Sequence, residues 1–101
     1  MQWRQGDVLI ESVDSIPDGA EIQKRNGRIV LAYGEVTGHA HAIHEQEVEE
    51  LKFNADVFLR VLRDKAKVVH EEHSPITLPK GNYRVIRQKE YSPAAIRNVQ
   101  D

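Results

Sequence analysis

The chain has 101 residues, of which 40% are hydrophobic and 30% are charged, with a formal net charge of −2 and no cysteine. This size and composition predict one globular domain spanning residues 1–101. They exclude disulfides, thiolate metal sites and cysteine nucleophiles. The small net charge provides no general attraction to nucleic acid or to an anionic membrane.

The N-terminal residues lack the apolar core of a signal peptide. No apolar run in the chain reaches the roughly 18 residues that a membrane-spanning helix needs. We therefore expect a cytoplasmic protein with no membrane partner.

Short β-prone runs separated by turn signals fill the first half of the chain. A turn at Gly6-Asp7 precedes a strand over 8–11, and a Pro-Asp-Gly turn follows at 17–19. The Asn26-Gly27 pair predicts a hairpin that joins a weak strand over 21–24 to a strand over 28–33. A further strand is expected over 38–43. The acidic run over 45–51 predicts a helical turn or an exposed connection.

The second half of the chain continues the same pattern. A turn at 54–56 is followed by the most apolar strand, over 57–62, a turn at 63–64 and a strand over 65–70. A short strand from 76 ends in a Pro-x-Gly turn at 79–81, before a last strand over 83–89. Ser92-Pro93 fits the start of a helix, so 92–100 is expected to be a short C-terminal helix or a tail.

About eight short strands predict an all-β fold, a small single-domain β-barrel or sandwich with a short C-terminal helix. Exposed strand edges in such a domain invite pairing with other chains. Self-association would hide these edges, so we expect a homo-oligomer.

Histidine is concentrated in two segments. Three of the five histidines fall at 39, 41 and 44, and the others are His70 and His73. A strand over 38–43 would place His39 and His41 on one face, because residues i and i+2 point the same way. Imidazole is the commonest protein ligand of transition metals. The alternative is that these are polar residues on a solvated strand face, paired with neighbouring glutamates.

The residue types predict a divalent transition metal such as Zn, Fe, Mn or Ni, held by imidazoles and a carboxylate with coordination positions left open. His39 and His41 are the first candidate ligands, and His73 or His70 would supply a third imidazole. Glu45, four residues after His41, is the candidate carboxylate.

The spacing of Gly34, His39, His41 and Glu45 resembles the first metal-binding motif of the cupin superfamily, which supplies two histidines and a glutamate from one hairpin. The second cupin motif contains Pro-x-Gly followed by a histidine. This chain has Pro79-Lys80-Gly81, but position 84 is Arg. The resemblance implies a cupin-like barrel with a metal bound by His39, His41 and Glu45, without the family's fourth ligand.

A second resemblance covers 34–41, 70–75 and 78–93. These segments are similar to those of a group of small uncharacterised bacterial and phage-type proteins, which carries no assigned activity. This resemblance suggests that the two histidine segments belong together.

Three functions are open from the sequence. The first is a metal-binding barrel that could be a metal-dependent enzyme acting on a small molecule, with Glu45, Tyr83 and Arg84 as candidate catalytic or substrate-orienting residues. The second is a non-catalytic assembly module with histidines at a subunit interface. The third, and less favoured, is a barrel that binds single-stranded nucleic acid through a basic face. That face would comprise Arg60, Arg63, Lys65, Lys67, Arg84, Arg87 and Lys89.

Overall fold

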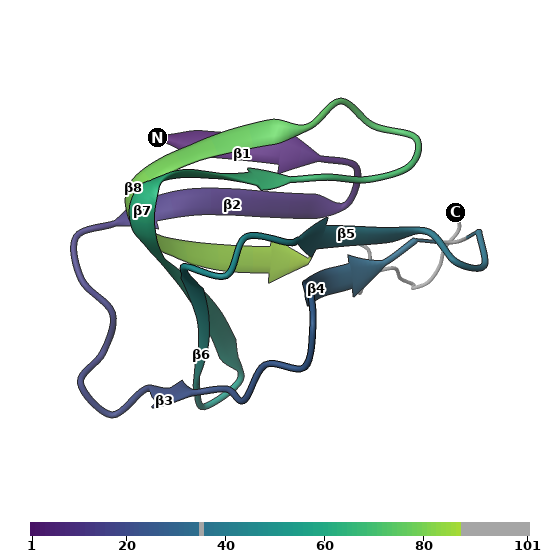
Figure 1. The fold of residues 1–101 in the computed structure, drawn as a ribbon. Helices are drawn as coiled ribbons and strands as arrows, with labels where there is room; N and C mark the ends of the chain where they lie inside the picture. Colours follow the sequence, from purple (N-terminus) through teal and green to yellow (C-terminus); the bar gives the residue numbers. More distant parts are fainter. Residues whose placement is uncertain (35, 88–101) are drawn as a thin grey trace, which may run out of the picture.

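A computed structural model describes residues 1–34 and 36–87, which form eight strands (Figure 1). The all-β prediction is confirmed for this part of the chain, and the expected helix at 92–100 lies outside the described residues. No helix long and apolar enough to cross a membrane occurs in the described part. The strands are β1 (Gln2–Gln5), β2 (Val8–Val13), β3 (Glu21–Ile22), β4 (Ile29–Tyr33), β5 (Ala40–Ile43), β6 (Val48–Phe53), β7 (Asp56–Val68) and β8 (Ile76–Arg87).

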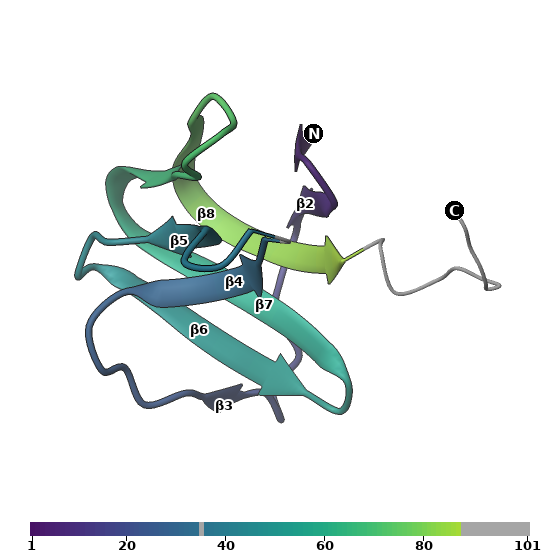
Figure 2. The ribbon, with the colours of Figure 1, turned by 90° about the vertical axis from the view of Figure 1, so that its right-hand side faces the viewer.

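The strands form two sheets that share one core. The larger sheet has the order β1-β2-β8-β7-β6-β3, and the smaller sheet pairs β4 with β5. The larger sheet is strongly curved, and the smaller sheet lies against it (Figure 2). Neither sheet closes into a barrel by hydrogen bonding. Residues from both sheets fill the core between them, including Ile10, Leu59, Leu78 and Val85 from the larger sheet and Ile29, Leu31 and Ile43 from the smaller one.

The opposite face of the larger sheet has a small core of its own. Phe58 and Leu51 pack there with Ile16, which comes from the connection between β2 and β3. Residues on either side of Phe58 belong to the main core, as the alternation of side chains along a strand requires. The consecutive apolar residues Val57, Phe58 and Leu59 are therefore explained by burial on both faces of β7.

A long bent hairpin of β7 and β8 replaces four shorter predicted strands. The predicted turns at 63–64 and 79–81 are wrong, because both segments lie inside continuous strands. The turn signals mark a bend instead. The pairing passes from Val61–Gly81 to Lys65–Pro79, so more residues separate the two pairs on β7 than on β8. This irregularity is a bulge, which lets paired strands curve without separating.

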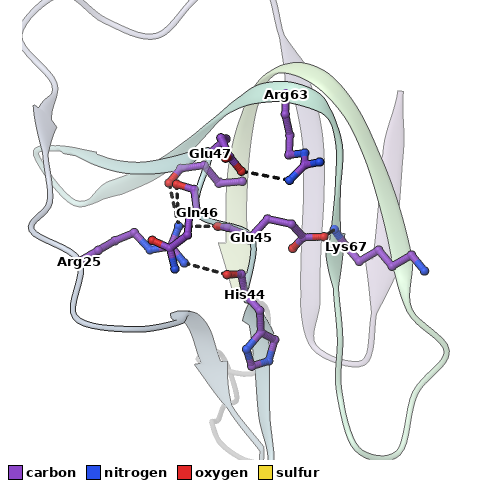
Figure 3. Close-up of polar contacts among 8 residues, drawn as sticks. Arg25, His44, Glu45, Gln46, Glu47, Arg63 and Lys67 are labelled. Atoms are coloured by element: carbon purple, nitrogen blue, oxygen red, sulfur yellow. Dashed lines mark hydrogen bonds and ion pairs between the residues drawn. The ribbon is translucent and has the colours of Figure 1, made fainter.

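The predicted hairpin around Asn26-Gly27 is also wrong. β3 pairs with β6, and β4 pairs with β5. Gly27 does adopt a positive φ of 86°, but the turn is held by Arg25 (Figure 3). Its guanidinium donates hydrogen bonds to backbone carbonyls between Ile43 and Val48, including those of His44 at 3.4 Å and Val48 at 3.1 Å. These bonds fix the chain beside the β5–β6 connection and direct it into the smaller sheet.

The acidic run over 45–51 is not a helical turn. Its second half forms β6, where Val48 and Leu51 are buried. Two of its glutamates pair with arginines of β7. Glu49 and Arg60 lie 2.8 Å apart, and Glu47 and Arg63 lie 3.1 Å apart. Because the flanking apolar residues are buried against β7, strand pairing overrides the acidic composition.

Substitution of Leu59 tests the main core. Leu59 is fully buried, so Leu59→Ala should lower the free energy of unfolding by about 2–5 kcal/mol through lost burial and a residual cavity. The matched control is Leu62→Ala, also on β7, where the side chain is 47% exposed. The control should change stability by no more than about 0.5 kcal/mol. Urea denaturation of both variants measures this, and equal losses would contradict the assignment of the core.

Candidate metal centre

A cleft of about 550 Å³ opens beside the smaller sheet. Four parts of the chain form its walls: the β1–β2 turn, the segment from β4 to the start of β5, the connection between β7 and β8, and the end of β8. Four of the five histidines line it. The lining residues are Gly6, Asp7, Val30, Leu31, Ala32, Tyr33, Gly34, Val36, His39, His41, His70, Glu72, His73 and Arg87.

One antiparallel bridge aligns the two histidine segments. Ala42 pairs with Val69, and the two residues exchange backbone hydrogen bonds of 3.0 and 2.9 Å. One step from this bridge, the same register sets His41 opposite His70. Residues directly opposite each other in an antiparallel pair project from the same face. The bridge therefore explains why imidazoles about 30 residues apart in the chain lie side by side.

Four imidazole rings form a continuous cluster in this cleft. The centroids of His41 and His70 are 4.3 Å apart, and those of His70 and His73 are 4.8 Å apart. His41 lies 6.0 Å from His73, and His39 lies 5.8 Å from His70. The structure thus brings together all four histidines that the sequence proposed as metal ligands.

Gln5 anchors the buried member of the cluster. The His41 ring is 4% exposed, and its Nδ1 lies 2.8 Å from Oε1 of Gln5. Gln5 is 2% exposed. Its amide nitrogen donates hydrogen bonds to the carbonyls of Val68, at 3.1 Å, and Ser74, at 2.9 Å. All polar atoms of the Gln5 side chain are therefore used to hold His41 and the chain on either side of His70 and His73.

Burial and the neighbouring histidines favour the neutral form of His41. Burial lowers the pKa of His41 below its ordinary value of 6.5, and the neighbouring His70 and His73 lower it further. Asp7 and Glu71 act in the opposite direction with smaller effects. A neutral imidazole retains the lone pair that a metal requires.

Two carboxylates reach the cluster from the segment after β7. Glu71 Oε1 accepts a hydrogen bond from Ala40 N at 2.9 Å, and this bond is the main cause that lowers the Glu71 pKa. Glu72 Oε2 lies 3.0 Å from Nδ1 of His39. That contact lacks hydrogen-bond geometry, and His39 Nδ1 is buried without a hydrogen-bond partner among the described residues. We therefore treat it as an electrostatic contact between a ring nitrogen and a carboxylate.

His39, His70 and Glu71 form the tightest potential ligand group. One ligand atom from each lies within 4.8 Å of the others. However, Nδ1 of His70 already accepts a hydrogen bond from Glu72 N at 3.0 Å. The three residues are close in space, but Nδ1 of His70 is already used by this hydrogen bond.

Two glycines provide the space that the cluster occupies. A Cβ at Gly6 would lie 2.9 Å from Nε2 of His73 and 3.4 Å from Cε1 of His41. A Cβ at Gly34 would lie 3.0 Å from Nε2 of His70 and 3.2 Å from Cβ of His39. Gly6 also has a φ of +57°, in the two-residue turn between β1 and β2. Glycine is the residue that this turn geometry favours.

The structure does not bring the remaining predicted site residues to the cleft. Glu45 Oε2 accepts a hydrogen bond from Lys67 N at 3.0 Å, and its side chain points toward β7 (Figure 3). Tyr83 is buried in the core, where its hydroxyl donates to the carbonyl of Pro79. Arg84 lies 3.5 Å from Asp56 and 3.9 Å from Glu11.

Gln5, Glu71 and Glu72 were not predicted as site residues, and Arg87 was predicted only as part of a basic face for nucleic acid, whereas it lines the cleft. The Gly6-Asp7 turn signal placed a tight hairpin near Gln5, but nothing local connected it to a histidine 36 residues away. Glu71 and Glu72 lie between His70 and His73, and their proximity to the histidines was the only available signal. From the sequence, pairing of these glutamates with imidazoles at the surface was the alternative to a metal site.

The fold and the site define an all-β domain of two packed sheets with a histidine-lined cleft. The chain belongs to the family described as domain of unknown function (DUF8820), whose model matches residues 4–88. This range includes Gln5, all five histidines and every residue that lines the cleft. No curated protein and no solved structure matches the chain.

Two effects of a side chain at position 6 can be separated: backbone strain at positive φ, and contact with His73. Gly6→Ala should lower the free energy of unfolding by about 1 kcal/mol, because alanine at positive φ is strained. It should also displace His73, whose ring end the new methyl group would contact. Gly27→Ala is the control, because Gly27 has a φ of +86° but no atom within 4 Å of an added Cβ. NMR signals of the imidazoles should shift in the first variant only, and shifts in both would contradict this role.

The lowered pKa of His41 predicts a dependence of stability on pH. The unfolded chain binds a proton at His41 near pH 6.5, whereas the folded protein resists protonation. The contribution to stability is therefore complete above 6.5 and is lost as the pH falls through the folded-state pKa. Glu71 contributes in a lower range, below its ordinary pKa of 4.5.

Urea unfolding between about pH 7 and about pH 5 measures this effect. His41→Asn removes the titrating group, while its amide can still donate to Gln5. The variant should therefore lose less stability on acidification than the parent. An equal loss in both proteins would show that His41 does not cause the pH dependence.

Proposed function

We propose that this protein binds a divalent transition metal ion in the histidine-lined cleft. The observation that carries the proposal is the convergence of four imidazoles and the carboxylates of Glu71 and Glu72 from two segments joined by the Ala42–Val69 bridge. Imidazoles and carboxylates without a thiolate suit Zn, Fe, Mn or Ni.

Two features of the cluster support a cation as the missing partner. The buried Nδ1 of His39 has no hydrogen-bond partner in the described part of the chain, and a buried polar atom in this condition calls for an explanation. It lies 3.0 Å from Glu72 Oε2. Two electron-rich atoms this close are stabilised by a positive charge between or beside them. A proton could provide that charge, and so could a metal ion.

The hydrogen bond from His41 to Gln5 is typical of the shell around metal ligands. Ligating histidines donate the second ring N–H to an oxygen, which fixes the orientation of the ring and the free nitrogen. His41 has this arrangement, and burial favours its neutral form. We therefore propose His39 and His41 as the principal ligands, with His73 and Glu71 as the further candidates. His70 is set apart from them because its Nδ1 already accepts a hydrogen bond from Glu72 N.

A metal in this cleft would have positions open to small molecules, since the cleft extends along the apolar residues Val30, Leu31 and Ala32. When bound, the ion could act as a Lewis acid or activate water. The cupin-like relationship stays a proposal, supported by the common location of Gly34, His39 and His41. Glu45 does not add to that support, because its side chain points away from the cleft and accepts a hydrogen bond from Lys67 N of β7.

Metal binding can be tested by titration. Protein purified without a histidine tag should bind about one zinc or cobalt ion per chain. The His39→Ala, His41→Ala double variant should bind more than about a hundredfold more weakly, because loss of an outer-shell partner alone costs 10–100-fold. Calorimetry and elemental analysis measure this.

His44→Ala is the matched control. His44 lies in the same segment, but it is exposed and does not line the cleft. The control variant should bind metal as the parent does. The proposal is wrong if the double variant holds as much metal as the parent.

A further inference from the structure

His41 and His70 are neighbouring rings whose hydrogen bonds use Nδ1 in opposite ways. Their centroids are 4.3 Å apart, and their planes differ by 32°. In a neutral imidazole one nitrogen carries the hydrogen and the other carries the lone pair. The partner of Nδ1 therefore determines what Nε2 presents to the cleft.

The tautomer of His41 follows from the amide of Gln5. The Gln5 amide nitrogen faces two carbonyl oxygens, those of Val68 and Ser74. A flipped amide would set its own oxygen against both, so the orientation is fixed by the network. Oε1 must then face His41 Nδ1 at 2.8 Å. Because Oε1 can only accept, Nδ1 carries the hydrogen and Nε2 carries the lone pair.

The tautomer of His70 is the reverse. The backbone N–H of Glu72 donates to His70 Nδ1 at 3.0 Å, so Nδ1 carries the lone pair. The neutral ring then carries its hydrogen on Nε2. This nitrogen lies beside Gly34 in the cleft wall, 3.0 Å from the position of an added Cβ.

We propose that the cleft binds an oxyanion beside the metal, with His41 Nε2 as a metal ligand and His70 Nε2–H as the donor to the anion. The anion would be a carboxylate or phosphate oxygen coordinated to the metal. This inference rests on the proposed metal-binding function and assigns His70 a different role from that of a ligand. Arg87 lines the same cleft and adds positive charge for such an anion.

The hydrogen bonds of His70 argue against its being a metal ligand, although it lies close to the other candidate ligands. Distances alone group His70 with His39 and Glu71 as ligands. However, a metal at Nδ1 would displace the Glu72 N–H, and a metal at Nε2 would displace the ring hydrogen and force Nδ1 to lose its donor. His41 needs neither change. In the existing hydrogen-bond network, His41 Nε2 therefore offers a lone pair to a metal, and His70 Nε2–H offers a hydrogen-bond donor.

The first test uses metal-free protein, so it does not depend on metal binding. Long-range ¹H–¹⁵N NMR spectra, recorded well above the ordinary imidazole pKa of about 6.5, identify the protonated nitrogen of each ring. We expect a protonated Nδ1 in His41 and a protonated Nε2 in His70. The same tautomer in both rings would overturn the inference.

Two variants of Gln5 separate the tautomer from the structural role. Gln5→Glu and Gln5→Met both lose the two donors to Val68 and Ser74, so both should be destabilised. Gln5→Glu keeps an oxygen that accepts from His41 Nδ1, whereas Gln5→Met does not. We expect the Nδ1–H tautomer of His41 to persist in Gln5→Glu and to become mixed in Gln5→Met. Loss of the tautomer in both variants would contradict the role given to Gln5 Oε1.

The second test uses cobalt-loaded protein titrated with acetate and, separately, with inorganic phosphate, monitored by the visible spectrum of the metal. His70→Ala should retain cobalt within a few-fold of the parent and bind the anions about tenfold or more weakly, as expected for loss of a hydrogen bond to a charged group. His70→Gln should restore much of the binding, because its amide N–H can replace Nε2–H. Acetate alone would indicate a carboxylate ligand, and phosphate alone would indicate a phosphate ester.

The outcomes distinguish this inference from the metal proposal. If the parent binds no cobalt, the proposed function fails, while the tautomers remain measurable in the metal-free protein. If the parent binds cobalt and His70→Ala loses it as severely as His41→Ala, then His70 is a ligand and the inference is wrong. Anion binding that is unchanged in His70→Ala would also overturn it.

Discussion

The pairing of Ala42 with Val69 is the constraint on which the site depends. It is an isolated bridge, yet it ties the smaller sheet to the end of β7 with two backbone hydrogen bonds. Without this contact, the part of the chain that carries His39 and His41 would not be joined to the segment after β7 that carries His70 and His73. The site is a consequence of how the two sheets are joined.

Sequence periodicity predicted the individual strands better than their partners. Alternation along 38–43 predicted a strand, and the structure has a shorter one, Ala40–Ile43, which contains His41 but begins after His39. The pairing around Asn26-Gly27 was wrong because Arg25 uses its guanidinium on carbonyls about 20 residues away. Turn signals at 63–64 and 79–81 were real local features, but pairing with each other turned them into a bend within β7 and β8. Turn-forming residues indicate where the backbone can bend, and pairing with distant residues determines whether the bend becomes a turn or stays within a strand.

The candidate site shows the same division between local and distant information. The histidines were identified by residue type, which the sequence displays directly. Gln5 was not, because its significance lies in contacts with residues 36, 63 and 69 positions away. A glutamine has no distinctive pattern in a sequence, whereas its buried amide in the fold determines which nitrogen of His41 is free. The carboxylate was assigned to Glu45 from spacing, and the backbone amide of Lys67 uses that side chain instead.

The three contacts of Gln5 also bear on when the site comes into existence. They join β1 to β5, to the last residue of β7 and to the connection that follows it, so the chain must close loops of 63 and 69 residues before the network is complete. Contacts at such separations form slowly compared with neighbouring hairpins. During synthesis on the ribosome, the nascent chain cannot assemble this network until Ser74 has emerged. An ion in the cleft would therefore bind only after the fold is nearly complete. By binding the native state alone, it would stabilise that state against unfolding.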